Sequence, residues 1–231
     1  MIGMFLAVET PGREIFLNFG TSTKILFYVL ATASIGIFTW GFYARIRKYR
    51  RGRPLARLDF GRFIRALGDI SSNRTIAKRN RVVGVAHFFV FWGFVVLLIG
   101  TTIIAIDVDI IGIILNKPEW QFWNGVFYSS YALILDVFGI GFVGGLLVLA
   151  RVRSNAPDRL NYSRVDEVET DRRGYQLDDR AFLGILLFLG ISGFLLEGFR
   201  IAATDYPDFE VVSIAGWTIA WITGPLGQVG N

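Results

Sequence analysis

The 231 residues are 53% hydrophobic, carry a net charge of +5 and have a mean hydropathy of +0.48. This composition favours lipid as the solvent, and the basic residues adjoin apolar segments, where membrane insertion explains them better than nucleic-acid binding does. With one histidine and no cysteine, the chain excludes disulfides, cysteine-ligated zinc and iron–sulfur clusters of its own, His-rich metal centres and the catalytic triads of hydrolases.

Four apolar segments are long enough to cross a hydrocarbon core of about 30 Å, which takes roughly 20 helical residues. They are residues 23–44, 82–106, 125–150 and 181–203. Helices are expected because an open strand edge in lipid would leave backbone groups unpaired. In the third segment, Gly141 and Gly145 are four residues apart, a spacing of small residues that allows two helices to pack closely. The sequence thus predicts an all-α, polytopic transmembrane helix bundle with four spans.

The charge of the connecting segments predicts their sidedness. Residues 45–81 contain thirteen Lys or Arg against two acids, and residues 151–180 contain seven arginines balanced by seven acids. Lys117 is the one basic residue of 107–124. Basic loops stay on the cytoplasmic side of a membrane. We therefore expect 45–81 and 151–180 to be cytoplasmic loops, with the N-terminus outside, in a multi-pass protein of the plasma membrane.

Two segments outside the spans leave alternatives open. Residues 53–70 alternate apolar side chains with arginines at helical spacing, so they could lie on anionic lipid or pack on the ends of the spans. Residues 211–224 are apolar but too short to be assigned as a span. The chain is either a four-span protein with a re-entrant end or the N-terminal part of a longer protein, and we expect the second.

His87 is the only histidine and lies inside an apolar run, about 9 Å along a helix from Arg81. A titratable side chain at membrane depth indicates a functional site, and neutral imidazole is a strong ligand of haem iron. Gly84 and Phe91 share its helix face, where glycine admits a flat macrocycle and phenylalanine packs on it. An interhelical hydrogen bond or a proton relay is the alternative.

Three further charges lie within predicted spans. Glu197 and Arg200 are three residues apart, so they share a helix face and can pair. We interpret them as candidates for quinone or proton handling; alternatively, Arg200 extends outward to water and Glu197 neutralises it. Asp136 lies deeper in its span. It is a candidate for a proton path or for a hydrogen bond between helices.

Two motifs carry a resemblance to a known family. The segments KRNRVVGVAHFFVFWGFVVLLIGT, residues 78–101, and GFLLEGFRIAATDYPDF, residues 193–209, resemble the membrane region of the respiratory nitrate reductase gamma-subunit family. They are most similar to the version fused to or paired with heterodisulfide-reductase-like iron–sulfur modules. The resemblance implies a five-helix cytochrome b with an outside N-terminus.

The resemblance also implies roles for single residues. His87 matches the family's haem ligand on the cytoplasmic side, whereas Leu97 stands where diheme members have a second histidine, which implies a single haem b. The family's opposing ligands lie on a fifth helix, which these residues do not contain, and Met1 and Met4 are expected on the wrong side. The second axial ligand is therefore expected from outside the chain, and iron–sulfur clusters only from a partner or a further region.

The function implied by the resemblance is that of a membrane electron-transfer domain in a quinone-linked oxidoreductase. It would carry haem b on His87 and exchange electrons between the quinone pool and cytoplasmic iron–sulfur or flavin partners, such as an electron-transfer flavoprotein. The alternative is a non-redox anchor or small transporter, with Asp136, Glu197 and Arg200 as its polar pathway. A visible absorption spectrum distinguishes the two.

Overall fold

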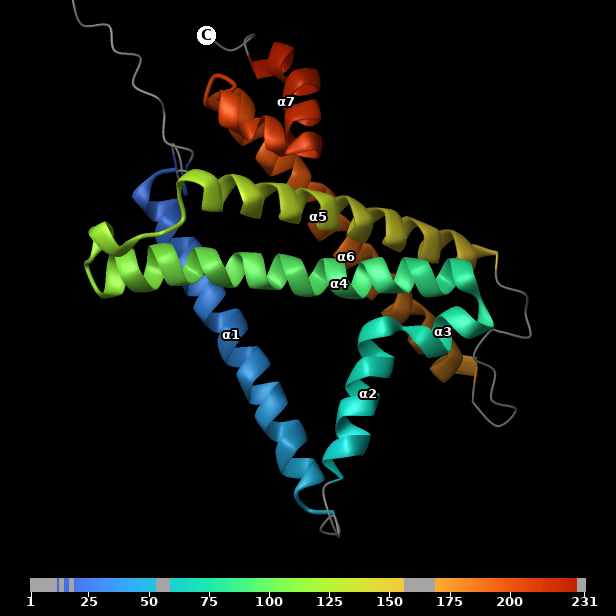
Figure 1. Ribbon diagram of the computed structural model, residues 1–231. Coiled ribbons are helices and arrows are strands. Elements are labelled where there is room, and N and C mark those ends of the chain that lie inside the picture. Colours follow the sequence, from blue (N-terminus) through green and yellow to red (C-terminus); the bar gives the residue numbers. More distant parts are fainter. Residues whose placement is uncertain (1–11, 13–14, 17–18, 53–58, 156–168, 228–231) are drawn as a thin grey trace, which may run out of the picture. The chain divides into compact units, whose positions relative to one another are not determined.

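The computed structural model describes residues 12, 15–16, 19–52, 59–155 and 169–227, and these contain helices and no β-strand (Figure 1). The α-helices are α1 (Thr21–Tyr49), α2 (Phe60–Ser72), α3 (Arg74–Arg79), α4 (Arg81–Ile104), α5 (Gly125–Ser154), α6 (Glu169–Ala203) and α7 (Ile214–Gly227). A π-helix, η1 (Ala105–Ile114), continues α4, and short 3₁₀ turns cover Pro118–Trp120 and Asp208–Val212.

The predicted all-α fold and its four membrane-length helices are confirmed. Among the described residues, the helices that are long and apolar enough to span are Thr21–Tyr49, Arg81–Ile114, Gly125–Ser154 and Leu177–Ala203. Each contains one predicted span. The second is longer than expected, because the sequence prediction ended that span at two aspartates whereas the helix continues through them as η1.

The described residues fall into two compact units, one within 13–67 and the other from Gly68 onward together with Gly12. The first unit contains α1, which buries none of its residues and exposes large apolar side chains such as Phe38 and Trp40. A helix that is apolar on all sides suits a lipid environment. The second unit contains α3 to α7 and all the site residues discussed below.

Glycines bring α4 and α5 into close contact. A Cβ added at Gly93 would lie 2.7 Å from Cβ of Phe142, and one added at Gly145 would lie 2.7 Å from the carbonyl oxygen of Ala86. Gly141 lies against the ring of Phe89 in the same way. Small residues allow two helix backbones to approach closely. The packing role predicted for Gly141 and Gly145 is therefore confirmed.

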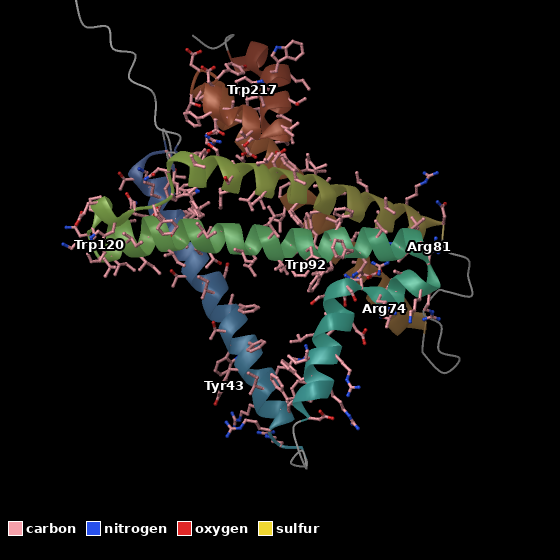
Figure 2. All side chains as sticks on the ribbon, viewed as in Figure 1. Tyr43, Arg74, Arg81, Trp92, Trp120 and Trp217 are labelled. Atoms are coloured by element: carbon pink, nitrogen blue, oxygen red, sulfur yellow. The ribbon has the colours of Figure 1, made fainter. Side chains whose placement is uncertain are left out.

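The α3 end of the second unit is held by contacts among α2, α3 and α4. The indole Nε1 of Trp92 donates to the carbonyl oxygen of Ser71, 2.8 Å away, and Gly84 lies directly against Ala77 (Figure 2 labels Trp92 on α4). The last turn of α2 thus contacts a span, whereas its earlier apolar side chains are exposed: Phe60, Phe63, Ile64 and Leu67. Residues 53–58, also part of the predicted amphipathic segment, lie outside the described residues.

α6 and α7 form an antiparallel hairpin. Gly198 lies against Ile219, and Gly216 lies against Glu197 and Ile201, so α7 runs back along the last turns of α6. The turn between them begins with Asp205 and Tyr206, both with positive φ. α7 has fourteen residues, and it is not among the helices of membrane-spanning length. The hairpin buries the polar groups that form the candidate site.

Candidate functional site

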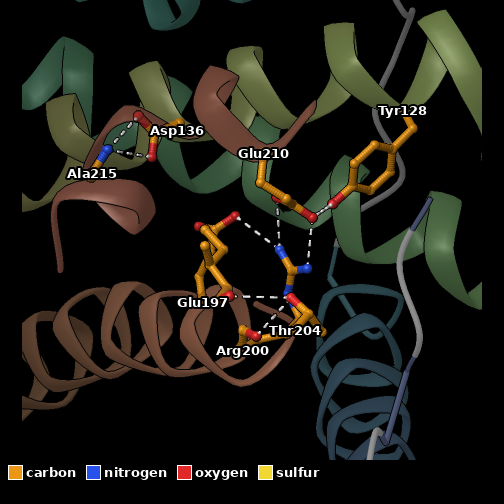
Figure 3. A network of polar contacts seen from close by, with 8 residues as sticks. Tyr128, Asp136, Glu197, Arg200, Thr204, Glu210 and Ala215 are labelled. Carbon is orange, nitrogen blue, oxygen red and sulfur yellow. Dashed lines mark hydrogen bonds and ion pairs between the residues drawn. The ribbon is translucent and has the colours of Figure 1, made fainter. Parts of the chain in front are cut away.

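Four polar side chains meet where α6 turns toward α7, and we name them the polar cluster: Tyr128, Glu197, Arg200 and Glu210 (Figure 3). The guanidinium of Arg200 donates from Nη1 and Nη2 to the two carboxylate oxygens of Glu210, at 2.6 and 3.0 Å. The hydroxyl of Tyr128 donates to Oε1 of Glu210 at 2.6 Å. Glu197 Oε1 lies 3.9 Å from Nη2 of Arg200.

The polar cluster is almost completely removed from solvent. Glu210 is 0% exposed, Tyr128 is 2% exposed and the side chain of Arg200 is 10% exposed. A bidentate ion pair has well-defined geometry and is stronger than a neutral hydrogen bond, and burial makes the loss of either partner costly. The Arg200–Glu210 pair therefore fixes the turn of the hairpin, while Tyr128 attaches that turn to α5.

The predicted pairing of Glu197 with Arg200 is only part of this arrangement. The structure brings the two together, but the principal partner of Arg200 is Glu210, which the sequence analysis did not single out. Arg200 does not extend outward to water, because Glu210 holds its guanidinium inside the protein. One signal could have indicated Glu210: no Lys or Arg follows residue 203, so a buried acid there has Arg200 as the nearest cation in sequence.

Asp136 connects α5 to the start of α7. Its side chain is 2% exposed, and its two carboxylate oxygens accept from the amide of Ala215 at 3.2 and 3.1 Å (Figure 3). Ala215 is the second residue of α7, where backbone amides have no partner within the helix and the helix dipole favours a negative charge. Asp136 thus forms a hydrogen bond between helices, one of the two roles considered for it.

Replacing Asp136 is expected to loosen the start of α7. In Asp136→Leu the amide of Ala215 loses its acceptor, so hydrogen exchange in the first turn of α7 accelerates and the free energy of unfolding falls by about 1 kcal/mol. Asp136→Asn keeps an acceptor oxygen and is the matched control, with exchange close to that of the natural protein. Hydrogen-exchange mass spectrometry measures both, and equal protection in the two variants would contradict this role.

Near the polar cluster, three buried polar atoms have no hydrogen-bond partner among the described residues: Nε of Arg200, Oγ of Ser213 and Nε1 of Trp123. Arg200 belongs to the cluster, and Ser213 and Trp123 contact it. The ring of Trp123 lies 5.4 Å from that of Tyr128, and the amide of Ser213 donates to the carbonyl of Glu210. Unpaired buried polar groups cost free energy, so each of these three atoms would gain from a hydrogen-bond partner.

Asp107, which the sequence analysis placed in a loop, positions Trp123. It is 3% exposed within η1, and its Oδ1 accepts from the amides of Phe122 and Trp123 at 2.6 and 3.2 Å. These bonds satisfy the carboxylate inside the helix, which explains why the helix does not end there. A π-helix is wider than an α-helix and often occurs at functional sites.

His87 lies in the second turn of α4, at the opposite end of the second unit from the polar cluster, and is partly buried. Its Nδ1 is buried and has no hydrogen-bond partner among the described residues. Ala77 of α3 occupies the space that a side chain at position 84 would fill, so α3 covers this part of the face of α4. The ring of Phe91 packs edge-on against Trp92 with 5.6 Å between centroids.

Of the residues predicted for a haem site, His87 is the one that could ligate iron, whereas the surface expected at Gly84 is covered by α3. His87 supplies one imidazole, and no group of three or more His, Cys, Asp or Glu side chains suited to a metal occurs in the part of the chain that the structure describes. The single histidine and the absence of cysteine leave no second imidazole or thiolate in the chain. The other axial position of a haem would need a ligand from elsewhere.

Comparison with known proteins gives one informative similarity. No family model matches the chain, and no solved structure matches it. A protein named EtfAB:quinone oxidoreductase, from Syntrophomonas wolfei subsp. wolfei, is 26% identical over 187 residues, which cover 77% of this chain and 22% of that protein. The chain therefore spans about a fifth of the length of this curated relative. It is similar to part of an oxidoreductase named for EtfAB and quinone.

Proposed function

We propose that this chain is the membrane domain of a quinone-linked oxidoreductase. The observation that carries the proposal is the similarity of 77% of the chain to part of an EtfAB:quinone oxidoreductase. The four helices of membrane-spanning length suit a substrate that dissolves in lipid. In this role the chain exchanges electrons between quinone and a cytoplasmic electron-transfer flavoprotein or iron–sulfur partner, as the nitrate reductase gamma-like resemblance also implies.

The protein would lie in the plasma membrane. The end of the second unit that contains α3 would face the cytoplasm. The basic residues of 45–81 and 151–180 support this orientation through the positive-inside rule. Both loops adjoin the helix ends near His87, since α4 begins at Arg81 and the salt bridge between Arg153 and Asp179 joins α5 to α6 there. Redox partners docking from the cytoplasm would then approach the side that carries the imidazole.

His87 would hold a single haem b at that end, with Phe91 packed beside it. The unpartnered Nδ1 of His87 and its place within an apolar helix support this assignment. Gly84 would contribute indirectly, by letting α3 pack close to one side of His87. A bound haem would supply one-electron transfer, and its opposing ligand would come from outside these 231 residues.

The polar cluster would handle quinone or its protons at the other end. The unpartnered donors of Arg200, Ser213 and Trp123 support this role, because a quinone carbonyl accepts hydrogen bonds. Glu197 lies at the edge of the cluster, with its side chain 21% exposed, and would exchange protons with the surroundings. Asp136 would act by positioning α7 beside the cluster.

A non-redox membrane anchor is the competing function. The observation that favours it is that Arg200, Glu210 and Asp136 all have partners within the chain, so their charges could serve stability alone. An anchor needs no haem and no quinone. The two functions therefore differ in their spectra.

The test is a visible difference spectrum, reduced minus oxidised, of the protein purified from its native membranes. We expect the absorption bands of a b-type haem in the natural protein, their loss in His87→Ala, and their retention in Asn80→Ala, a change at the helix cap of the same segment. A colourless natural protein would refute the haem, and an unchanged spectrum in His87→Ala would refute the ligand. Loss of electron exchange with quinone in Glu197→Gln, at an unchanged spectrum, would support the role of the cluster.

A further inference from the structure

An apolar groove of about 490 Å³ lies between α4 and α5 at their α3 end. Its walls are aliphatic and aromatic, with Val85 and Phe89 from α4 and Val148 from α5, and Gly141 and Gly144 contribute from the middle of α5. A Cβ built at Gly144 would meet no atom within 4 Å, so the groove is open at this point. An extended hydrocarbon chain suits such a surface.

One charged side chain, that of Arg81, belongs to the groove and lies at its end. Arg81 is the first residue of α4, so it marks the boundary between the apolar helix and the polar loop before it (Figure 2). Lys78 and Arg79 precede it in α3, and all three carry positive charge. A guanidinium at the end of a span matches the level of lipid phosphate groups and can bind one through two hydrogen bonds.

We propose that this groove is a binding site for an anionic phospholipid. Its phosphate lies on the guanidinium of Arg81, and one acyl chain follows the groove past Gly144 between Val85 and Val148. Charge complementarity and the apolar lining both support this occupant. The site is independent of the proposed redox function, because it uses neither His87 nor the polar cluster.

An isoprenoid quinone fits the groove less well than a phospholipid. A quinone ring needs hydrogen-bond donors for its two carbonyl oxygens, and the groove offers a polar side chain only at its end. The unpartnered donors of Arg200, Ser213 and Trp123 lie at the other end of these helices. A phospholipid instead matches the groove, because its phosphate can meet Arg81 at the end and its acyl chain can follow the apolar walls.

The test is native mass spectrometry of the full chain released from nanodiscs that contain equal amounts of phosphatidylglycerol and phosphatidylcholine. We expect one retained phosphatidylglycerol per chain. Arg81→Gln should weaken the preference for the anionic lipid about fivefold, the effect of one interfacial cation, while Arg81→Lys keeps most of it. Gly144→Leu fills the groove and should abolish retention of both lipids. Its thermal unfolding should stay unchanged, since the added side chain meets open space.

Arg151→Gln is the matched control, because it removes the same charge at the same end of the helices but does not line the groove. It should leave the retained lipid in place. Equal losses in Arg81→Gln and Arg151→Gln would overturn the site in favour of general surface attraction. Two further results would overturn the site: equal retention of phosphatidylcholine and phosphatidylglycerol by the natural protein, or undiminished lipid retention in Gly144→Leu.

Discussion

Glu210→Gln is expected to lower the free energy of unfolding by about 3 kcal/mol, because the buried guanidinium of Arg200 then keeps only the more distant carboxylate of Glu197, 3.9 Å away, as a counter-charge. The substitution keeps the shape of the side chain, so packing changes little. Glu210 also accepts the hydroxyl of Tyr128, and that bond weakens when the acceptor loses its charge. Chemical or thermal unfolding of the detergent-solubilised protein measures the change. Asp208→Asn, an exposed acid of the same turn, is the matched control and should be neutral.

A double-mutant cycle separates the ion pair from its surroundings. Arg200→Gln should destabilise the protein by a similar amount to Glu210→Gln, since it leaves a carboxylate uncompensated. The double variant should lose less than the sum of the two, because the second substitution no longer breaks the Arg200–Glu210 pair. If Glu210→Gln were no more destabilising than Asp208→Asn, the pair would not be what holds the hairpin turn.

Gly93→Leu is expected to disrupt the contact between α4 and α5, with a loss of about 3 kcal/mol in the free energy of unfolding. Its Cβ alone would lie 2.7 Å from Cβ of Phe142 and 2.9 Å from the carbonyl oxygen of Phe138. The second obstacle is backbone, which cannot rotate away, so the two helices must separate. Loss of their contacts also weakens the attachment of Tyr131 to the carbonyl of Gly100.

Gly184→Leu is the control for this substitution. Gly184 lies in α6, and a Cβ there would meet nothing within 4 Å, so the variant tests the cost of replacing glycine in a span without a helix contact. Its unfolding transition should match that of the natural protein or rise slightly. Equal transitions in the two variants would mean that α4 and α5 do not pack through Gly93.

The spans could be predicted because their signal is local. A stretch of about 20 predominantly apolar residues suffices to indicate a membrane helix, and each of the four segments supplies one without reference to any other part of the chain. The extension of α4 through η1 was missed because it depends on contacts that are not local. Whether Asp107 ends a helix depends on whether the amides of Phe122 and Trp123 reach it, and no local pattern contains that information.

The polar cluster was only partly predictable. The spacing of Glu197 and Arg200 correctly put them on one helix face, but the stronger partner, Glu210, reaches Arg200 through a turn with two residues of positive φ. The bond from Ala215 to Asp136 joins residues 79 apart, where neither helix period nor charge pattern applies. Similarly, the spacing of Gly141 and Gly145 predicted that α5 packs closely on another helix. It did not predict that the neighbouring Gly144 would face open space.

Tyr128 and Asp136 both depend on partners that are synthesised late. Their acceptor and donor, Glu210 and Ala215, follow them by 82 and 79 residues, respectively. At translation rates of about 5–20 residues per second, α5 exists for roughly 4 to 16 s before these partners emerge. During that interval its carboxylate would be unsatisfied in hydrocarbon, so nascent α5 should remain beside the insertion machinery and enter the lipid together with the hairpin that completes it.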